Sequence, residues 1–261
     1  MNKALKILCT VFLVGCTTVP ITCRRQVSLM NESELVQMSL VQYNDFIATN
    51  AVVGDYDQQA QLVKKVGDKI AKACEEFLKE NGHADRVKDF NWEFNLVDDP
   101  TVNAWCMPGG KVVFYTGIFP ICEDEEGIAV VMGHEVAHAV ARHGNERMSQ
   151  GMIQEMGNTT LSMAMSQEPE TTRALFQTAY GLSSNLGVLA YSRNHESEAD
   201  KMGLVFMTKA GYNPEAAAEF WTRMSQSGGA APPEWMSTHP SNERRINDIN
   251  TYIPVAKSLV K

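Results

Sequence analysis

The sequence predicts an α+β fold that is mainly α-helical, with a small β-sheet packed on one buried helix. Most apolar positions recur with helical spacing, two short segments between residues 91 and 116 have the character of strands, and one segment around residue 134 is apolar on nearly all sides. The chain has 261 residues, of which 44% are hydrophobic and 21% charged, so it is long enough to bury the core of one such domain.

The first 15 residues have the pattern of a secretory signal. Two lysines precede an apolar stretch that is shorter than the roughly 20 residues of a membrane-spanning helix. The stretch ends at Cys16 in Leu-Val-Gly-Cys, which resembles the bacterial lipobox, where a lipid is attached to the cysteine. We therefore expect residues 1–15 to be a lipoprotein signal peptide, residues 16–34 a lipid-attached tether and residues 35–261 the folded domain. An ordinary signal peptide with an incidental cysteine is the alternative.

The residue after Cys16, the net charge and the cysteines indicate where the protein is located and which partners it is expected to have. The threonine after Cys16 favours the outer membrane, so we expect a periplasmic protein that reaches the membrane only through its lipid. The formal net charge of −8 argues against a nucleic-acid partner. We expect the remaining cysteines to form one disulfide or to be buried thiols, since their spacing does not suggest a thiolate zinc site. They are Cys23, Cys74, Cys106 and Cys122.

Helix and strand patterns alternate along the middle of the chain. Apolar residues follow helical spacing over 62–77, and Asn81-Gly82 would end that helix. Residues 91–97 alternate as a strand does, and a second strand, 111–116, follows a Pro-Gly-Gly turn. Four acidic residues from Glu123 suit the start of a buried helix that Gly144 would end. Further helices are expected near residues 170–182, 189–210, 214–226 and 241–252, with a loop at 228–233.

The buried helix contains His134-Glu135-Val136-Ala137-His138, an HExxH sequence. Four residues rotate a helix by about 400°, so both imidazoles share one face and suit a zinc ion. Glu135 projects about 100° away, where it is placed to take a proton from a water on the metal. Satisfied core histidines are the weaker alternative, because burying two imidazoles and a carboxylate among apolar residues needs a reason.

A third metal ligand is expected downstream. The longer metzincin motif is absent, and His143 lies about 140° round the helix from His138, so we expect it to be a cap or packing residue. Glu196 and Asp200 lie one turn apart on a second helix, where the first suits zinc and the second suits the free N–H of a ligating histidine. His195 is expected to be exposed.

Four motifs in order make the chain resemble the gluzincin metallopeptidases of the CAAX-prenyl-protease and HtpX type. Its likeness is greatest to their soluble periplasmic lipoprotein members of the β-barrel-assembly-enhancing kind, without the helical-repeat tail of that protease. The motifs are Asn103-Ala104-Trp105 with Pro108-Gly109-Gly110, the HExxH sequence with Arg142-His143, Glu196-Ser197-Glu198-Ala199-Asp200 with Gly203, and Ser237-Thr238-His239-Pro240 with Arg245-Ile246.

The resemblance implies one Zn²⁺ per chain, with Glu135 as general base and Asp200 behind the ligands. The implied ligands are His134, His138 and Glu196. His239 matches a family histidine near the metal, which polarises the scissile carbonyl or caps the zinc in a resting state, and Arg245 is expected to support it. A surface histidine in a Thr-His-Pro turn is the alternative for His239.

Gluzincins receive substrate as an added strand on an exposed sheet edge beside the metal. The resemblance implies that Asn103 and Ala104 bind substrate, together with an edge formed by Val112, Val113, Phe114 and Tyr115. An interior strand is the alternative for these four residues.

The function implied by the resemblance is that of a zinc-dependent endopeptidase of the bacterial cell envelope. It would hydrolyse peptide bonds in unfolded or misassembled proteins by metal-activated water. The alternative is a chaperone-like module that binds peptides and carries a capped structural zinc. A deformylase-like hydrolase fits poorly, because Cys122 does not stand in a matching sequence context.

Overall fold

The computed structural model describes residues 16–158, 179, 192–227, 235, 239 and 243–260. The expected signal peptide, most of the helix expected near 170–182 and the loop at 228–233 lie outside these residues. The helices are α2 (Glu32–Thr49), α3 (Gln58–Glu80), α4 (Phe119–Cys122), α5 (Glu125–Val140), α6 (His143–Asn158), α9 (Arg193–Lys209), α10 (Ala216–Ser227) and α12 (Glu243–Leu259). The strands are β1 (Cys16–Thr18), β2 (Arg25–Val27), β3 (Glu93–Val97), β4 (Ala104–Met107) and β5 (Lys111–Tyr115).

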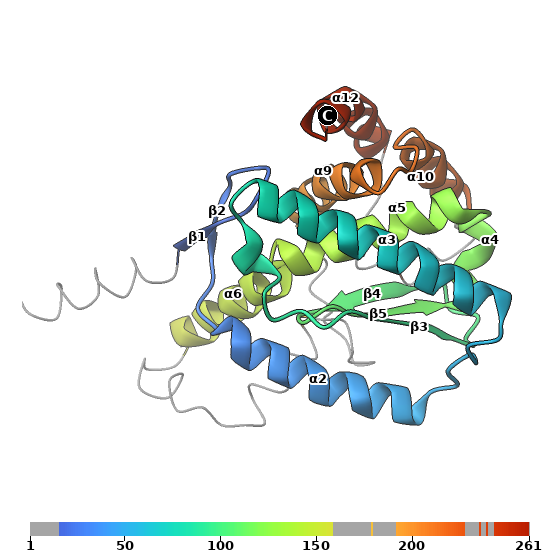
Figure 1. Ribbon diagram of the computed structural model, residues 1–261. Coiled ribbons are helices and arrows are strands. Elements are labelled where there is room, and N and C mark those ends of the chain that lie inside the picture. Colours follow the sequence, from blue (N-terminus) through green and yellow to red (C-terminus); the bar gives the residue numbers. More distant parts are fainter. Residues whose placement is uncertain are drawn as a thin grey trace, which may run out of the picture.

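The elements form layers around α5. From top to bottom, Figure 1 shows α12, then α9 with α10, then α5 behind α3, then the sheet of β3 to β5, and finally α2. Every residue of α5 from Gly127 to Val140 is buried, which agrees with the apolar character predicted for this helix. The small sheet lies against α5, so the predicted α+β architecture is confirmed.

The order of strands in the sheet is β3, β5, β4, with β3 parallel and β4 antiparallel to β5. Strand β5 is therefore the central strand, and the expectation that residues 112–115 form an exposed edge is wrong. Val112 and Phe114 pack into the main core, while Val113 belongs to a second apolar cluster between the sheet and α2. A strand covered on both faces has a continuous run of apolar residues. Such a run does not show whether the strand is central or at the edge of its sheet, so the sequence did not reveal the central position of β5.

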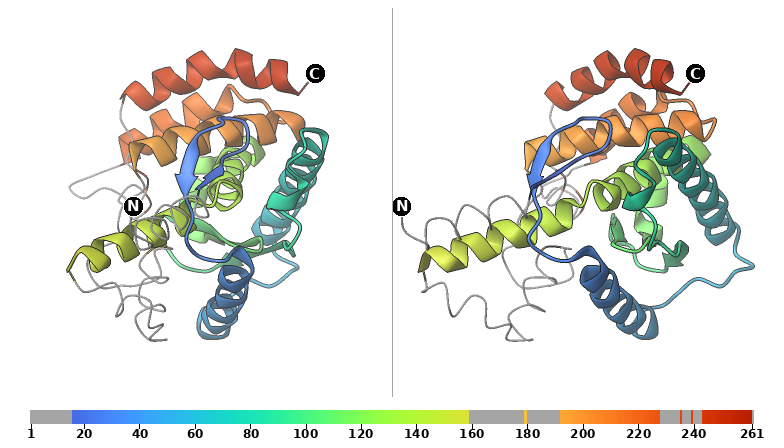
Figure 2. Two further views of the ribbon diagram at one scale, coloured as in Figure 1. Left: turned by 90° about the vertical axis from the view of Figure 1, so that its left-hand side faces the viewer. Right: turned by 60° about the vertical axis from the view of Figure 1, so that its left-hand side comes forward.

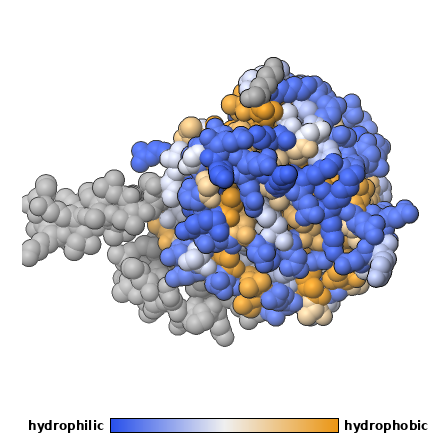
Figure 3. All heavy atoms as spheres, in the orientation of Figure 1, coloured by the Kyte–Doolittle hydropathy of each residue, from blue (hydrophilic) through white to orange (hydrophobic). Residues whose placement is uncertain are grey.

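The second cluster covers the face of the sheet opposite α5. Leu35 and Tyr43 of α2 pack there on Met107 and Val113. Sequence reasoning did not identify α2, although Asn31 caps it by accepting a hydrogen bond from the backbone N–H of Ser33. The face drawn in Figure 3 is mainly hydrophilic, with apolar side chains in small groups.

The helix predicted to continue to Gly144 is broken into α5 and α6. Arg142 has a φ of 59°, the left-handed conformation that ends helices, and its N–H reaches the carbonyl of Ala139. The break turns α6 into a new direction (Figure 2).

The end of α3 was predicted closely, since Asn81 follows its last residue. The starts were not: Asp57 caps α3 and Ser192 caps α9 through their side chains. Helix α12 continues to Leu259, beyond the end expected near residue 252.

Part of the segment predicted to be a tether is folded onto the domain. Strands β1 and β2 pair antiparallel as a short hairpin, which lies beside α9 in Figure 2. Gln26 of this hairpin is buried and donates a hydrogen bond to the carbonyl of Ala141 at 2.8 Å. The hairpin is thus attached where α5 ends.

The four cysteines agree with the second of the two states expected for them, except that one is exposed. The thiols of Cys23, Cys74, Cys106 and Cys122 are free, and all but Cys23 are buried. Among the described residues no helix has the length and apolar character needed to cross a bilayer.

Candidate metal centre

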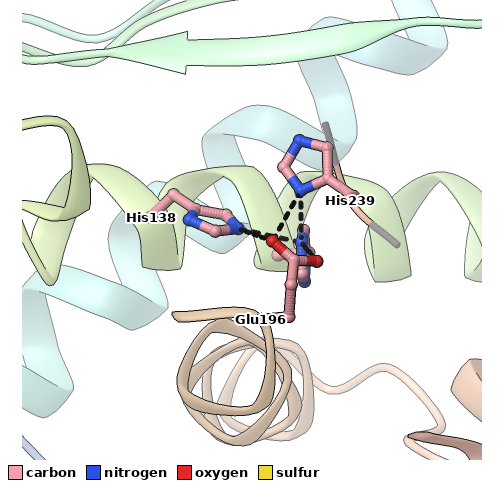
Figure 4. A group of neighbouring side chains, drawn as sticks. His138, Glu196 and His239 are labelled. Atoms are coloured by element: carbon pink, nitrogen blue, oxygen red, sulfur yellow. Dashed lines mark hydrogen bonds and ion pairs between the residues drawn. The ribbon is translucent and has the colours of Figure 1, made fainter. Parts of the chain in front are cut away.

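Four buried side chains point at one another where α5 crosses α9. His134 and His138 come from α5, Glu196 from the first turn of α9, and His239 from the chain before α12. Figure 4 shows His138, Glu196 and His239 converging from their separate segments. Each of these residues is at most 3% exposed, and their ligand atoms all lie within 4.8 Å of one another.

The spacing of these atoms fits a tetrahedral zinc site. Zinc bonds of about 2.0–2.1 Å place tetrahedral ligands about 3.3 Å apart. Nε2 of His138 lies 3.0 Å from Nε2 of His134 and 3.3 Å from Oε1 of Glu196. Nε2 of His134 lies 3.5 Å from Oε2 of Glu196. Two imidazoles and a carboxylate, gathered and buried in this way, are the donor set of a catalytic zinc site.

Two glycines allow this convergence. A Cβ built on Gly203 of α9 would lie 2.9 Å from the carbonyl carbon of Gly133 on α5 and 3.0 Å from the backbone nitrogen of His134. The two helix backbones therefore touch one residue before the first metal-ligand histidine. This close crossing brings the carboxylate of Glu196 within reach of both histidines.

The Asp200 contact behind His134 agrees with the prediction. Arg245 was expected to support His239, and the structure places its guanidinium on Asp200 and Glu196. Nδ1 of His134 lies 3.0 Å from Oδ1 of Asp200, and Arg245 donates to both oxygens of that carboxylate at 2.7 and 2.8 Å. The Arg245 guanidinium also lies 2.8 Å from Glu196 Oε2 and stacks 3.3 Å from the centroid of the Trp221 ring. Burial lowers the pKa of His134, but the hydrogen bonds and charges of Asp200 and Glu196 outweigh burial and raise it to about 9.

Glu135 lies beside the cluster with a partner that sequence reasoning missed. The indole N–H of Trp235 donates to Oε1 of Glu135 at 2.8 Å, and Nε2 of His239 lies 3.7 Å from the same oxygen. Burial raises the pKa of the Glu135 carboxyl, and the Trp235 hydrogen bond opposes that rise. A tryptophan four residues before His239 gave no motif signal, so only the fold could reveal this contact.

His239 lies at ligand distance from two of the other three donors. Its Nδ1 is 3.2 Å from Nε2 of His134 and 3.1 Å from Oε1 of Glu196. His239 is 3% exposed, so the alternative of a surface histidine is excluded. Of the two roles left open for it, this position matches a cap on the fourth corner of the metal site.

Two histidines differ from expectation. His195, expected to be exposed, is 2% exposed, and its Nε2 lies 3.1 Å from a carboxylate oxygen of Glu146. His143 is fully buried, and its Nδ1 lies 2.8 Å from Nδ1 of His138, because the break at Arg142 turns its side chain back toward the metal centre. Extrapolating the angle along an unbroken helix gave the wrong direction.

The predicted substrate residues separate into two groups. Val112, Val113 and Phe114 are fully buried in the central strand and have no free strand edge. Ala104 begins β4, which has a strand neighbour on one side only among the described residues. Asn103 precedes it, and the carbonyl of the neighbouring Val102 accepts the backbone N–H of Trp235 at 3.1 Å. The start of β4 is thus joined to the residue that contacts Glu135.

Sequence comparison agrees with this geometry. Residues 59–253 match peptidase family M48. The chain belongs to this family. The site therefore belongs to a metallopeptidase domain, and the cofactor of M48 metallopeptidases is zinc, for which the four donors are suited.

The similar proteins come from mitochondria and from bacteria. The mitochondrial metalloendopeptidase OMA1 of Schizosaccharomyces pombe is 36% identical over 66% of this chain and 49% of its own length. The human metalloendopeptidase OMA1 is 29% identical over 91% of this chain and 46% of its length. The β-barrel assembly-enhancing protease of Escherichia coli O157:H7 is 28% identical over 64% of this chain and 35% of its length.

These identities refine the resemblance drawn from the motifs. The β-barrel assembly-enhancing proteases do match, but with lower identity than the S. pombe mitochondrial protein, so a special likeness to them is only partly supported. The chain spans about half the length of the OMA1 proteins it matches.

Proposed function

We propose that this chain is a zinc-dependent endopeptidase that cleaves unfolded or misassembled polypeptides in the bacterial cell envelope. The observation that carries the proposal is the placement of Glu135 beside a complete set of zinc donors. A structural zinc site does not require a buried carboxylate next to the ligands, whereas hydrolysis requires a base there.

The residues around the zinc donors have separate roles in the proposed hydrolysis of a peptide bond. When bound, zinc supplies an acidified water and a Lewis acid for the scissile carbonyl. Glu135 accepts the proton of the attacking water at its carboxylate and returns it to the nitrogen of the leaving amine. Its raised pKa suits the first of these steps, because a more basic carboxylate accepts the proton of the water more readily. The Trp235 N–H keeps the carboxylate facing the site.

Substrate selection follows from the sheet. An extended peptide added to the outer edge of β4 would form backbone hydrogen bonds that are independent of its side chains. Asn103 and Ala104 stand at the start of this strand and would contact the peptide. Folded proteins rarely offer a free extended segment, so this geometry favours unfolded or misassembled polypeptides as substrates.

The proposed location is the periplasm, with lipid attachment at Cys16 to the outer membrane. Two points support it: the lipobox-like sequence that ends at Cys16, and the presence of bacterial β-barrel assembly-enhancing proteases among the relatives. Labelling with a lipid precursor in cells, followed by substitution Cys16→Ala, tests the anchor. Label that remains on the variant would contradict it.

The activity is tested by digesting an unfolded casein with the purified protein, whose zinc content is measured in parallel. We expect about one zinc per chain and cleavage that a chelator abolishes and added zinc restores. A matched reaction with a folded, compact protein should show little cleavage. Casein left intact by the fully zinc-loaded protein would contradict the proposal.

A second candidate function is favoured by the position of His239. With Nδ1 of His239 at ligand distance, the fourth corner of the site is closed, as in a peptide-binding module that carries a capped zinc. Binding of unfolded casein without any cleavage, both in the natural chain and after His239→Ala, would favour this module over the peptidase.

A further inference from the structure

Each HExxH histidine needs a partner for the ring nitrogen that faces away from the metal. For His134 this partner is Asp200, which is in turn held by Arg245. Such partners fix the tautomer and the orientation of a ligating ring. The corresponding partner of His138 is different in kind, and it extends to a distant part of the chain.

Nδ1 of His138 lies 2.8 Å from Nδ1 of His143, and Nε2 of His143 lies 2.9 Å from Oε2 of Glu198. Because Nε2 of His138 faces the ligand cluster, its proton belongs on Nδ1, which then donates to His143. His143 accepts at Nδ1 and therefore carries its own proton on Nε2, from which it donates to Glu198. This series of contacts allows one arrangement of protons when metal is bound.

The series ends on Arg24, in the loop before β2. Its Nε donates to Oε2 of Glu198 at 2.9 Å, and the hydroxyl of Thr22 donates to the other oxygen of that carboxylate. Arg24 also binds Glu146 through both terminal nitrogens, at 2.8 and 2.7 Å. Glu198 and Glu146 are only 3% and 6% exposed, so a cation that binds both holds them in place as well as neutralising them.

The groups that contact the outer nitrogens of His134 and His138 are arranged alike. Each set joins an HExxH histidine to a carboxylate from α9 and an arginine from another segment. We propose that Arg24 is a positioning residue of the metal centre, which fixes the ring and tautomer of His138 through Glu198 and His143. The N-terminal hairpin is then part of the metal site and not only a connection to it. The inference concerns zinc binding, so it stands independently of whether the chain cleaves peptides.

The test measures the zinc dissociation constant of the full chain by competition with a chromophoric chelator. We expect Arg24→Gln to weaken zinc binding by about tenfold, the lower end of the effect of losing a direct partner of a metal ligand, because Arg24 acts through Glu198 and His143. The matched control is Arg25→Gln, which removes the neighbouring, exposed arginine of the same hairpin and should leave the constant unchanged. The visible absorption spectrum of the Co²⁺-substituted protein should change for Arg24→Gln and not for the control.

Arg24→Gln leaves two buried carboxylates without the arginine that binds both, so its zinc affinity is compared only when thermal unfolding shows that the variant is folded. Thr22→Val removes one hydrogen bond to Glu198 without leaving a charge unpaired, and we expect it to weaken zinc binding about threefold, the effect of one hydrogen bond. In a Glu198→Gln background, Arg24→Gln should cause little further loss, because both changes break the same series. Zinc affinities of folded Arg24→Gln and Thr22→Val equal to that of Arg25→Gln would overturn the proposal; if only Thr22→Val folds, its unchanged affinity alone would do so.

Discussion

The indole N–H of Trp235 donates a 2.8 Å hydrogen bond to Oε1 of Glu135. The Trp235 ring also stacks on that of Trp221, with 5.0 Å between centroids, and Trp221 in turn carries the guanidinium of Arg245 on its ring. The proposed base and the support of His134 are therefore joined by one stack of flat side chains. This stack fixes the direction of the Glu135 carboxylate relative to the zinc donors.

Replacing Trp235 by Phe keeps the stack and removes the hydrogen bond. We expect kcat to fall by about tenfold with little change in KM or zinc content, because the carboxylate loses its orientation. Since the lost bond favoured the carboxylate, the pKa of Glu135 rises and the acidic limb of the kcat profile moves to higher pH. Trp92→Phe is the control, because it removes an indole bond to Glu75 away from the site. A kcat equal to that of the control would show that Trp235 has no positioning role.

Glu135→Gln separates metal binding from hydrolysis. The amide has the size of the carboxyl but accepts no proton, so we expect zinc content to remain and casein cleavage to fall by about 10²–10⁴-fold. Zinc is quantified by atomic absorption on the same samples that are assayed. Proteolysis retained at the natural rate would remove Glu135 from the proposed mechanism.

The crossing of α5 and α9 predicts an effect at a residue that binds nothing. Gly203→Ala places a methyl group 2.9 Å from the backbone of Gly133, so the helices must separate. We expect the free energy of unfolding to fall by about 1–3 kcal/mol and zinc affinity to fall with it, since Glu196 moves with α9. Gly54→Ala, where a Cβ meets nothing within 4 Å, is the control in chemical denaturation and zinc titration. Unchanged zinc affinity in Gly203→Ala would mean that the crossing distance does not govern the site.

The parts of this site that could be predicted are those set by local geometry. His134 and His138 are four residues apart, so they share one face of their helix whatever the rest of the fold is. Glu196 and Asp200 have the same spacing and likewise share one face of theirs. The family motifs added His239 and Arg245, although they linked Arg245 to His239 and its guanidinium binds Asp200 and Glu196. These predictions needed no knowledge of how the segments meet.

The contacts that escaped prediction join segments far apart in the chain. Trp235 meets Glu135 across 100 residues, and Arg24 meets Glu198 across 174. His143 was misplaced because a break of a single residue, Arg142, redirects everything after it. The central position of β5 was equally hidden, since an apolar run suits a covered strand and also a strand whose edge is open.

Acid should destabilise the metal-free protein through Glu146. Burial alone would raise the pKa of this carboxyl, but hydrogen bonds from Arg24 and His195 outweigh burial and hold it well below its usual value. A carboxyl with a lowered folded-state pKa stabilises the fold above its unfolded pKa of about 4.3, and this contribution is lost as pH falls below that value. We expect the melting temperature to fall more steeply below about pH 4.5 in the natural chain than in Glu146→Gln. The exposed Glu80→Gln serves as control, and identical slopes in all three proteins would contradict this assignment.

His239→Ala distinguishes the two roles that the family histidine can have. The Nδ1 of His239 stands at ligand distance from His134 and Glu196, so its removal should weaken zinc binding by about tenfold and leave the fourth corner free for water. At saturating zinc we therefore expect casein cleavage to be faster than in the natural chain. The measurement is kcat on one fluorescent peptide derived from casein, with zinc buffered at a concentration where both proteins are fully loaded. A fall in kcat of about 10²-fold under these conditions would instead assign His239 to stabilising the oxyanion, because that is the usual cost of losing one such donor.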